Sequence, residues 1–146
     1  MSTTTVTAQG ITITRVFAAP REAVFQAWTD PKQFAVWFGG ESTQLEDVVM
    51  DVRPTGTWSA TMVLPGGSTI PWSGTYHEVV PPERLAFTLT DQPGVEGEPC
   101  TVVLTATDEG THMVFTQTGS HLTEEQYGQA ANGWGTFFDA MESLLP

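Results

Sequence analysis

Residues 123–145 read TEEQYGQAANGWGTFFDAMESLL and carry the clearest helical signal in the sequence. Thr123 followed three residues later by Gln126 has the spacing of a capping box, in which each side chain bonds the backbone N–H of the other. Apolar residues then recur at steps of four and three, which predicts a long amphipathic helix. Because this apolar stripe is long and aromatic, we expect it to lie across a sheet. The stripe consists of Tyr127, Ala131, Trp134, Phe138, Met141 and Leu145.

Three glycines interrupt this predicted helix, at Gly128, Gly133 and Gly135. Each is unfavourable by about 1 kcal/mol relative to alanine in a helix interior. We therefore expect a packing or space-making reason for them.

Upstream of the helix, from about residue 43 to residue 118, β-branched and aromatic residues occur in short runs that are separated by turn residues. Six strands fit between these turns, and their short connections favour antiparallel pairing. Residues 94–99, which include Glu96 and Glu98, form the longest predicted loop, and we expect it to be exposed. The turns are Pro54-Thr-Gly56, Pro65-Gly-Gly-Ser68, Pro81-Pro82, residues 93–99 and Asp108-Glu-Gly110.

The first strand is predicted over residues 11–17, where mainly apolar residues alternate with other side chains. Two short helices follow, one starting near Pro20 and one capped by Asp30. Residues 1–10 are predicted to be a flexible tail, and residues 11–146 a single domain. The apolar faces of the two helices are Val24, Phe25 and Trp28, then Phe34, Trp37 and Phe38.

The 146 residues include five Lys or Arg and 17 Asp or Glu, which gives a formal net charge of −12. So few cations exclude a basic surface for nucleic acid and disfavour anionic membranes. Disorder is excluded too, since 40% of the residues are hydrophobic and 10% are aromatic. All five cations precede residue 85, whereas residues 85–146 carry nine acids.

One cysteine, Cys100, cannot form an internal disulfide. The sequence has no basic leader with an apolar core, and no apolar run of membrane-spanning length. We therefore expect a cytoplasmic protein. The sequence makes no prediction about its oligomeric state.

Several spaced motifs between residues 11 and 145 together resemble the Hsp90-ATPase-activator-homologue (AHSA1-like) branch of the START-like, or SRPBCC, superfamily. They are Arg15-Val-Phe-Ala-Ala-Pro20, Val24-Phe25-Gln-Ala-Trp28-Thr-Asp-Pro31, Trp37-Phe38-Gly39, Asp51-Val-Arg-Pro-Thr-Gly-Thr-Trp58, Gly74-Thr-Tyr-His-Glu-Val-Val-Pro-Pro-Glu-Arg-Leu85, Gly110-Thr111, Thr116-Gln117 and Gly133-Trp134.

The resemblance implies an α+β helix-grip fold, also described as START-like or Bet v 1-like. In that fold a curved antiparallel sheet of about seven strands wraps around a long C-terminal helix, two short helices follow the first strand, and a cavity lies between sheet and helix. This chain departs from the family at Phe38, where a second Trp is usual, at Gly40, where Pro is usual, and at Thr55, where a second Gly is usual. Thr55 suggests a different turn before Trp58.

No histidine or cysteine lies at metal-ligand spacing, so we predict no metal, and no glycine-rich strand-to-helix motif predicts a nucleotide cofactor. His77, in the middle of a predicted strand, and His121, just before the terminal helix, are the candidate general bases if the protein is an enzyme. Arg53 and Arg84 are interpreted as partners of neighbouring acids near turns, with a ligand carboxylate as the alternative.

Family members range from ligand carriers to enzymes and chaperone partners, so the fold alone leaves three hypotheses open. The leading one is binding of a small, mainly apolar or aromatic molecule in the cavity, which the acid excess predicts to be neutral or cationic. The second is a small cyclase, dehydratase or hydrolase that uses the same cavity with a histidine base. The third is an Hsp90-type interaction module. The predicted binding residues are Trp37, Phe38, Trp58, Met62, Tyr76, His77, Phe115, Gln117, Trp134 and Phe138.

Overall fold

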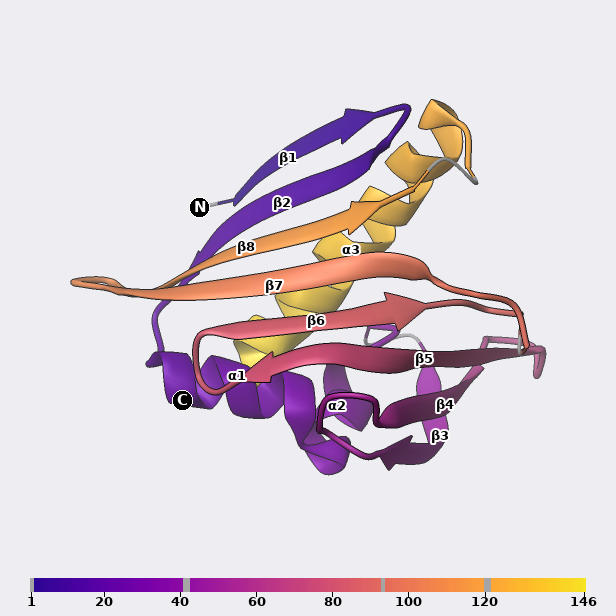
Figure 1. Cartoon of the computed structure of the whole chain (residues 1–146), viewed down its shortest axis with the longest axis horizontal. Coiled ribbons are helices and arrows are strands. Elements are labelled where there is room, and N and C mark those ends of the chain that lie inside the picture. Colours follow the sequence, from indigo (N-terminus) through magenta and orange to yellow (C-terminus); the bar gives the residue numbers. More distant parts are fainter. Residues whose placement is uncertain (1, 41–42, 93, 120–121) are drawn as a thin grey trace.

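The computed structural model describes residues 2–40, 43–92, 94–119 and 122–146. In these residues, eight strands form one antiparallel sheet in the order β1-β2-β8-β7-β6-β5-β4-β3 (Figure 1). The α+β class and the helix-grip arrangement predicted from the sequence are confirmed. The strands are β1 (Ser2–Thr7), β2 (Gly10–Phe17), β3 (Gln44–Met50), β4 (Thr57–Val63), β5 (Thr69–Val80), β6 (Arg84–Leu89), β7 (Glu98–Thr107) and β8 (Gly110–Thr118).

Three helices cover one face of this sheet: α1 (Arg21–Thr29), α2 (Pro31–Trp37) and α3 (Glu124–Leu144). In Figure 1, α3 crosses behind the strands on a diagonal, and α1 and α2 lie beside its C-terminal end. None of the helices in the described part of the chain combines the length and apolarity that a membrane crossing requires.

The beginning of the chain differs from its predicted form as a tail. Ser2–Thr7 form β1, which pairs antiparallel with β2 through registers such as Val6 with Ile11. Consecutive threonines suit an edge strand, because a β-branched side chain favours extended backbone and its hydroxyl tolerates solvent. This strand accounts for the difference between the eight strands observed and the seven or so predicted.

The terminal helix has the predicted start. The Thr123 hydroxyl accepts a hydrogen bond from the Gln126 N–H at 3.1 Å, and the Gln126 side chain accepts one from the Thr123 N–H at 2.9 Å. The capping box is therefore complete. The buried stripe of α3 comprises Tyr127, Ala131, Trp134, Phe138 and Met141, as the periodicity predicted, together with Ala140.

The two short helices are also confirmed. The Asp30 carboxylate accepts a hydrogen bond from the Lys32 N–H at 2.9 Å and so caps α2. Pro31 occupies the first position of this helix, where its missing N–H costs nothing. The indole of Trp37, at the end of α2, donates to the Ala27 carbonyl at 2.7 Å, which fixes α2 against α1.

Aromatic rings fill the middle of the space between sheet and helices. Trp28 of α1 lies at the centre of this cluster and is 2% exposed. Its indole contacts rings from both other helices and from β6 and β8, at centroid distances of 4.8 to 6.1 Å. The centre of the helix-grip interior is thus packed core. The rings around Trp28 are Trp37, Phe87, Phe115, Trp134 and Phe138.

Candidate functional site

A pocket of about 420 Å³ lies to one side of this packed centre, between the first half of α3, the end of the sheet and the β6–β7 connection. Its volume is within the range of about 300 to 1,000 Å³ that small-molecule sites occupy. Most of its wall is apolar or aromatic. The lining residues are Phe38, Trp72, Leu89, Thr90, Asp91, Gln92, Val95, Glu96, Gly97, Glu98, Gln117, Leu122, Ala130, Gly133, Trp134 and Phe137.

Small residues on α3 make room for this pocket. Ala130, Gly133 and Phe137 are spaced by three and four residues, so they share the helix face that borders it. Among the described residues, a Cβ on Gly133 would meet no atom within 4 Å beyond its chain neighbours and the backbone of its own helix. Gly133 therefore supports the space-making interpretation. Gly128 and Gly135 also border open space but do not line the pocket.

Glu98 is the deepest charged residue of the pocket wall, and only 8% of its surface is exposed. It is the first residue of β7 and shares the inner face of that strand with Cys100 and Val102. One carboxylate oxygen accepts a hydrogen bond from the Gln117 amide at 2.6 Å, and the other accepts one from the Tyr127 hydroxyl at 2.5 Å. The carboxylate is thus held in a defined orientation between the sheet and α3.

Gln117 connects this carboxylate to the helix. The Trp134 indole N–H donates to the Gln117 side-chain oxygen at 2.9 Å. An indole N–H only donates and a carboxylate only accepts, so the Gln117 oxygen must face Trp134 and its NH₂ must face Glu98. These two partners leave Gln117 one amide orientation. Gln117 is the polar group that the sequence predicted within an apolar enclosure.

Cys100 lies next to Glu98 on the inner face of β7 and is fully buried. Burial raises the pKa of its thiol well above the usual value, and the negative charge of Glu98 raises it further. A thiol that stays protonated is a poor nucleophile. Cys100 therefore serves as packing behind the polar end of the pocket.

The burial of Glu98 corrects the prediction that residues 94–99 form an exposed loop. β7 begins at Glu98, and the pairing of Leu89 with Glu98 continues the β6–β7 ladder up to this residue. The missed signal is the alternation of Glu98, Cys100, Val102 and Leu104, which places the acid on the same face as three apolar residues. Asp91 and Glu96, in the β6–β7 connection, are exposed at the rim.

Three of the predicted binding residues line the pocket: Phe38, Gln117 and Trp134. Trp58 and Tyr76 instead border a separate void of about 10 Å³, enough for about one water molecule. The other four apolar residues of the predicted set are buried and line neither space. They are Trp37, Met62, Phe115 and Phe138.

The pocket also uses residues outside the predicted set. Trp72 and Leu89 come from the sheet, and Phe137 comes from the second apolar row of α3. Phe137 could have been found from its spacing to Gly133 and Ala130. Trp72 lies four residues before Tyr76 on β5, so alternation along the strand places it on the same face as that predicted residue.

Among the described residues, no histidine lines this pocket. His77 is exposed and borders a hollow of about 440 Å³ on the opposite face of the sheet. His112 is half-buried on β8 and does not line the pocket. The candidate base His121 lies outside the described residues. Among the described side chains, no group of three His, Cys, Asp or Glu is placed to hold a metal ion.

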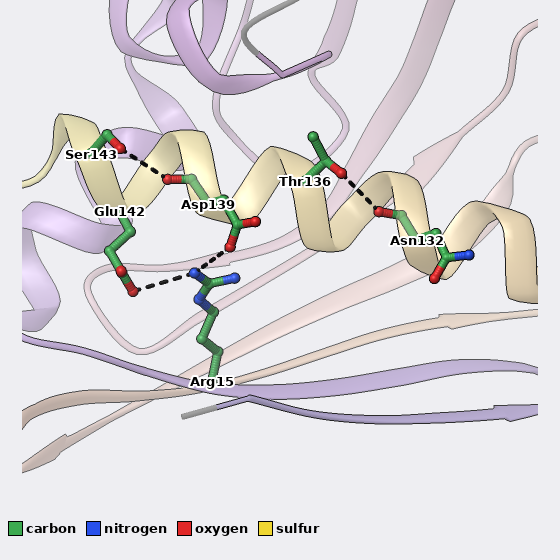
Figure 2. Close-up of polar contacts among 6 residues, drawn as sticks. All are labelled: Arg15, Asn132, Thr136, Asp139, Glu142 and Ser143. Atoms are coloured by element: carbon green, nitrogen blue, oxygen red, sulfur yellow. Dashed lines mark hydrogen bonds and ion pairs between the residues drawn. The ribbon is translucent and has the colours of Figure 1, made fainter.

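The arginines are engaged elsewhere. Arg53 pairs with Asp51 at 2.9 Å and Arg84 pairs with Glu78, so their interpretation as partners of neighbouring acids is confirmed. Figure 2 shows Arg15 reaching from β2 to Asp139 and Glu142, near the C-terminal end of α3, at 2.7 and 3.3 Å. This contact ties the sheet to the half of α3 that lies away from the pocket.

Comparison with models of known protein families identifies the family of this chain. The family model described as activator of Hsp90 ATPase homolog 1-like protein matches residues 18–146. The chain belongs to this family. The match confirms the resemblance seen in the sequence motifs and covers every element of the AHSA1-like fold from α1 to α3.

Solved structures of several bacterial proteins share this fold. A protein from Nitrosomonas europaea has a TM-score of 0.81 at 27% identity, covering 94% of this chain and 94% of that one. A protein from Chromobacterium violaceum has a TM-score of 0.83 at 24% identity, covering 94% and 97%. An AHSA1-like protein from Aeromonas hydrophila has a TM-score of 0.74 at 23% identity, covering 98% and 90%. A search of curated proteins finds no match.

Proposed function

We propose that this AHSA1-like protein binds a small, mainly apolar molecule in the pocket between the β6–β7 connection and the first half of α3. The observation that carries the proposal is an apolar pocket of about 420 Å³ with a fixed polar end. Small-molecule sites combine apolar walls with a few oriented polar groups. Here the walls include Trp72, Trp134 and Phe137, and the polar end is the Glu98–Gln117 pair.

The polar end is held in place before a ligand arrives. Gln117 is fixed from two sides, and Glu98 accepts hydrogen bonds from both the sheet and the helix. Groups that are already oriented lose little conformational freedom on binding, which favours affinity. The pocket is therefore suited to recognition of a ligand with one polar end and an apolar body.

A histidine-dependent enzyme is less well supported than binding. His77 is exposed on the opposite face of the sheet, so it cannot exchange a proton with a molecule in the pocket. An Hsp90-type partner, which the family description suggests, requires an exposed apolar patch. The large hydrophobic side chains exposed among the described residues are single valines on separate segments, namely Val36, Val49, Val80 and Val95.

Binding is tested by filling the pocket from the helix. Gly133→Leu places a side chain into the pocket, and Gly128→Leu places the same side chain on α3 outside it. Native mass spectrometry and thermal shift against a panel of hydrophobic small molecules should show ligands that bind the wild type and Gly128→Leu but not Gly133→Leu. A panel without any ligand, or a ligand that Gly133→Leu still binds, would overturn the proposal.

A further inference from the structure

We infer that β1 is the surface through which two copies of this chain associate, edge to edge and antiparallel, so that their sheets join into one. The inference goes beyond the proposed function and does not depend on it, because no residue of β1 lines the pocket. It rests on the exposure of this edge, on its contrast with the opposite edge of the sheet, and on the distribution of charge.

β1 is the last strand at its end of the sheet, and in the described part of the chain it pairs with β2 alone (Figure 1). In an antiparallel pair, every second residue of an edge strand turns its N–H and C=O away from the partner strand. Five of the six residues of β1, all except Val6, are exposed. β1 therefore presents backbone donors and acceptors to solvent, which is the template for adding another strand.

The opposite edge of the sheet has features that block such pairing. β3 carries two adjacent exposed acids, Glu46 and Asp47, and its register with β4 shifts between Glu46 and Val49. Asp47 has a φ of 52°, so the backbone leaves the extended conformation at this shift. Charges and bulges of this kind keep edge strands from pairing with other chains. β1 has no charged residue, no proline and no shift in its register with β2.

The charge of the molecule makes a second copy of the chain the suitable partner for this edge. Two molecules with a net charge of −12 repel each other, so association is favoured where it brings few acids together. The strands β2, β8 and β7, next to β1, have two charged residues, Arg15 and Glu98, and both bond to α3 on the inner face. The outer face beside β1 is therefore uncharged, whereas a basic partner would be attracted to the acids elsewhere on the molecule.

β1 is also complementary to itself. Antiparallel pairing of two identical strands creates a two-fold axis, so both copies use the same residues and association through β1 stops at two. The outer side chains of the strand are Thr3, Thr5 and Thr7. Threonine thus meets threonine across the axis, and such cross-strand pairs stabilise a sheet. A six-residue strand buries less than the standard interface of about 1,600 Å², so we expect a weak and reversible dimer.

Sedimentation equilibrium with the full chain tests the inference. The mass should rise from that of one chain toward that of two as the concentration increases from about 1 μM to about 1 mM. The double variant Thr3→Glu, Thr5→Glu brings acids of the two copies together and should weaken association by about tenfold or more. The matched control is Thr105→Glu, Thr118→Glu, which adds the same charge at exposed threonines of β7 and β8 and should weaken it by less than about threefold.

Hydrogen exchange of the wild type gives a second measurement that needs no variant. Alternate amides of residues 2–7 should exchange more slowly at high protein concentration, because the outward N–H groups of β1 become bonded in the dimer. Amides of β3 should exchange at the same rate at every concentration. Raising NaCl from about 20 mM to about 300 mM should strengthen association several-fold, since salt screens the repulsion between the two copies.

The outcomes separate this inference from the proposed function. A chain that stays monomeric at the highest concentration overturns the inference, and so does protection that appears on β3 instead of β1. Equal weakening by the β1 variant and its control would place the contact on the face of the sheet and also overturns it. Should the β1 variant fail to fold, the exchange measurement on the wild type decides. Gly133→Leu, which fills the pocket, should associate like the wild type.

Discussion

Thr55 is held in a backbone conformation that its side chain disfavours. Its φ is 69°, within the left-handed region, where a β-branched residue is an outlier. The turn is held by hydrogen bonds from the Thr55 N–H to the Tyr76 carbonyl and from the Gly56 N–H to the Arg53 carbonyl, both at 2.8 Å. The sequence suggested that Thr55, where relatives usually have Gly, forms a different turn. In the structure, Thr55 has a backbone conformation that glycine adopts easily.

We therefore expect Thr55→Gly to stabilise the protein. The left-handed conformation is unfavourable by about 1 to 2 kcal/mol for a residue with a Cβ, and glycine avoids this strain. Part of the gain is lost, because glycine gives the unfolded chain more conformational freedom. The net gain in the free energy of unfolding should be roughly 0.5 to 1 kcal/mol, measured by urea denaturation. Thr57→Gly, at an exposed position that starts β4, is the control and should destabilise. A loss of stability in Thr55→Gly would contradict the conclusion that the backbone is strained at Thr55.

Because its thiol is buried, Cys100 should make the protein less stable as the pH becomes alkaline. Burial, with a contribution from Glu98, keeps the thiol protonated in the folded protein, whereas in the unfolded chain it ionises near pH ~8.5. The resulting stabilisation is complete below that pH and is lost as the pH rises toward the folded pKa. The free energy of unfolding, measured by urea denaturation, should decline between pH ~7 and ~9.5, and Cys100→Ala should reduce this decline.

Tyr76 provides the control for this experiment. Burial, and to a smaller extent Asp51, also raises the pKa of its hydroxyl, but tyrosine in the unfolded chain ionises only near pH ~10. Tyr76→Phe should therefore leave the decline below pH ~9.5 in place. Parallel pH profiles for the wild type and Cys100→Ala would contradict the assignment to the thiol.

Glu98 shows where single residues are hard to predict. Its neighbours Gly94, Gly97 and Pro99 have loop composition, so the local sequence favours an exposed acid. Its burial depends on Gln117 and Tyr127, which are 19 and 29 positions away. Alternation along β7 indicates the face of the side chain, but only the tertiary partners show that a carboxylate is accommodated there.

At the scale of elements, the glycines of α3 are open to substitution. In the part of the chain that the structure describes, a Cβ at Gly128, Gly133 or Gly135 would have no atom within 4 Å other than those of its chain neighbours and its own helix backbone. Each change to alanine should therefore gain most of the helix-propensity difference, about 0.5 to 1 kcal/mol, as read from thermal or urea denaturation. A loss of stability in any of the three variants would mean that the backbone conformation at that position requires glycine.

The same three variants should differ in ligand binding. Gly133→Ala adds a methyl group to the pocket wall, whereas Gly128→Ala and Gly135→Ala do not. We expect only Gly133→Ala to change the affinity for a pocket ligand, in titrations of all three variants. Equal affinities would indicate that the pocket has room to spare at this turn of the helix.

The elements themselves were largely predictable. The capping box at Thr123 and the stripe from Tyr127 to Met141 place α3 almost to the residue, because both signals are local. The edge strand at the start of the chain is harder to predict. Residues 2–7 have no apolar face of their own, so their strand exists because β2 offers an open edge with which to pair.

At the scale of the molecule, the position of the pocket follows from how five tryptophans and their neighbours pack. Trp28 contacts rings from α2, α3, β6 and β8 and fills the centre of the fold. The remaining space lies where α3 presents Gly133 and Ala130 instead of large side chains. Sequence patterns identify the residues that face inward, but which of them meet depends on long-range packing. The cavity was therefore predicted for the whole interior and is found at one end.

The charge of the whole molecule makes a last prediction, on salt. Because 17 acids outnumber five cations, repulsion between like charges outweighs attraction in the folded protein. Salt screens this repulsion and so reduces its destabilising effect. The surface ion pairs lost to screening contribute only about 0 to 1 kcal/mol each. The melting temperature should therefore rise between about 20 mM and about 300 mM NaCl, over which screening lengths fall below about 10 Å. The double variant Glu46→Gln, Glu109→Gln removes two exposed charges and should melt higher at low salt and gain less from added salt. A melting temperature that falls with salt would show that the ion pairs of Arg15, Arg53 and Arg84 outweigh the acid excess.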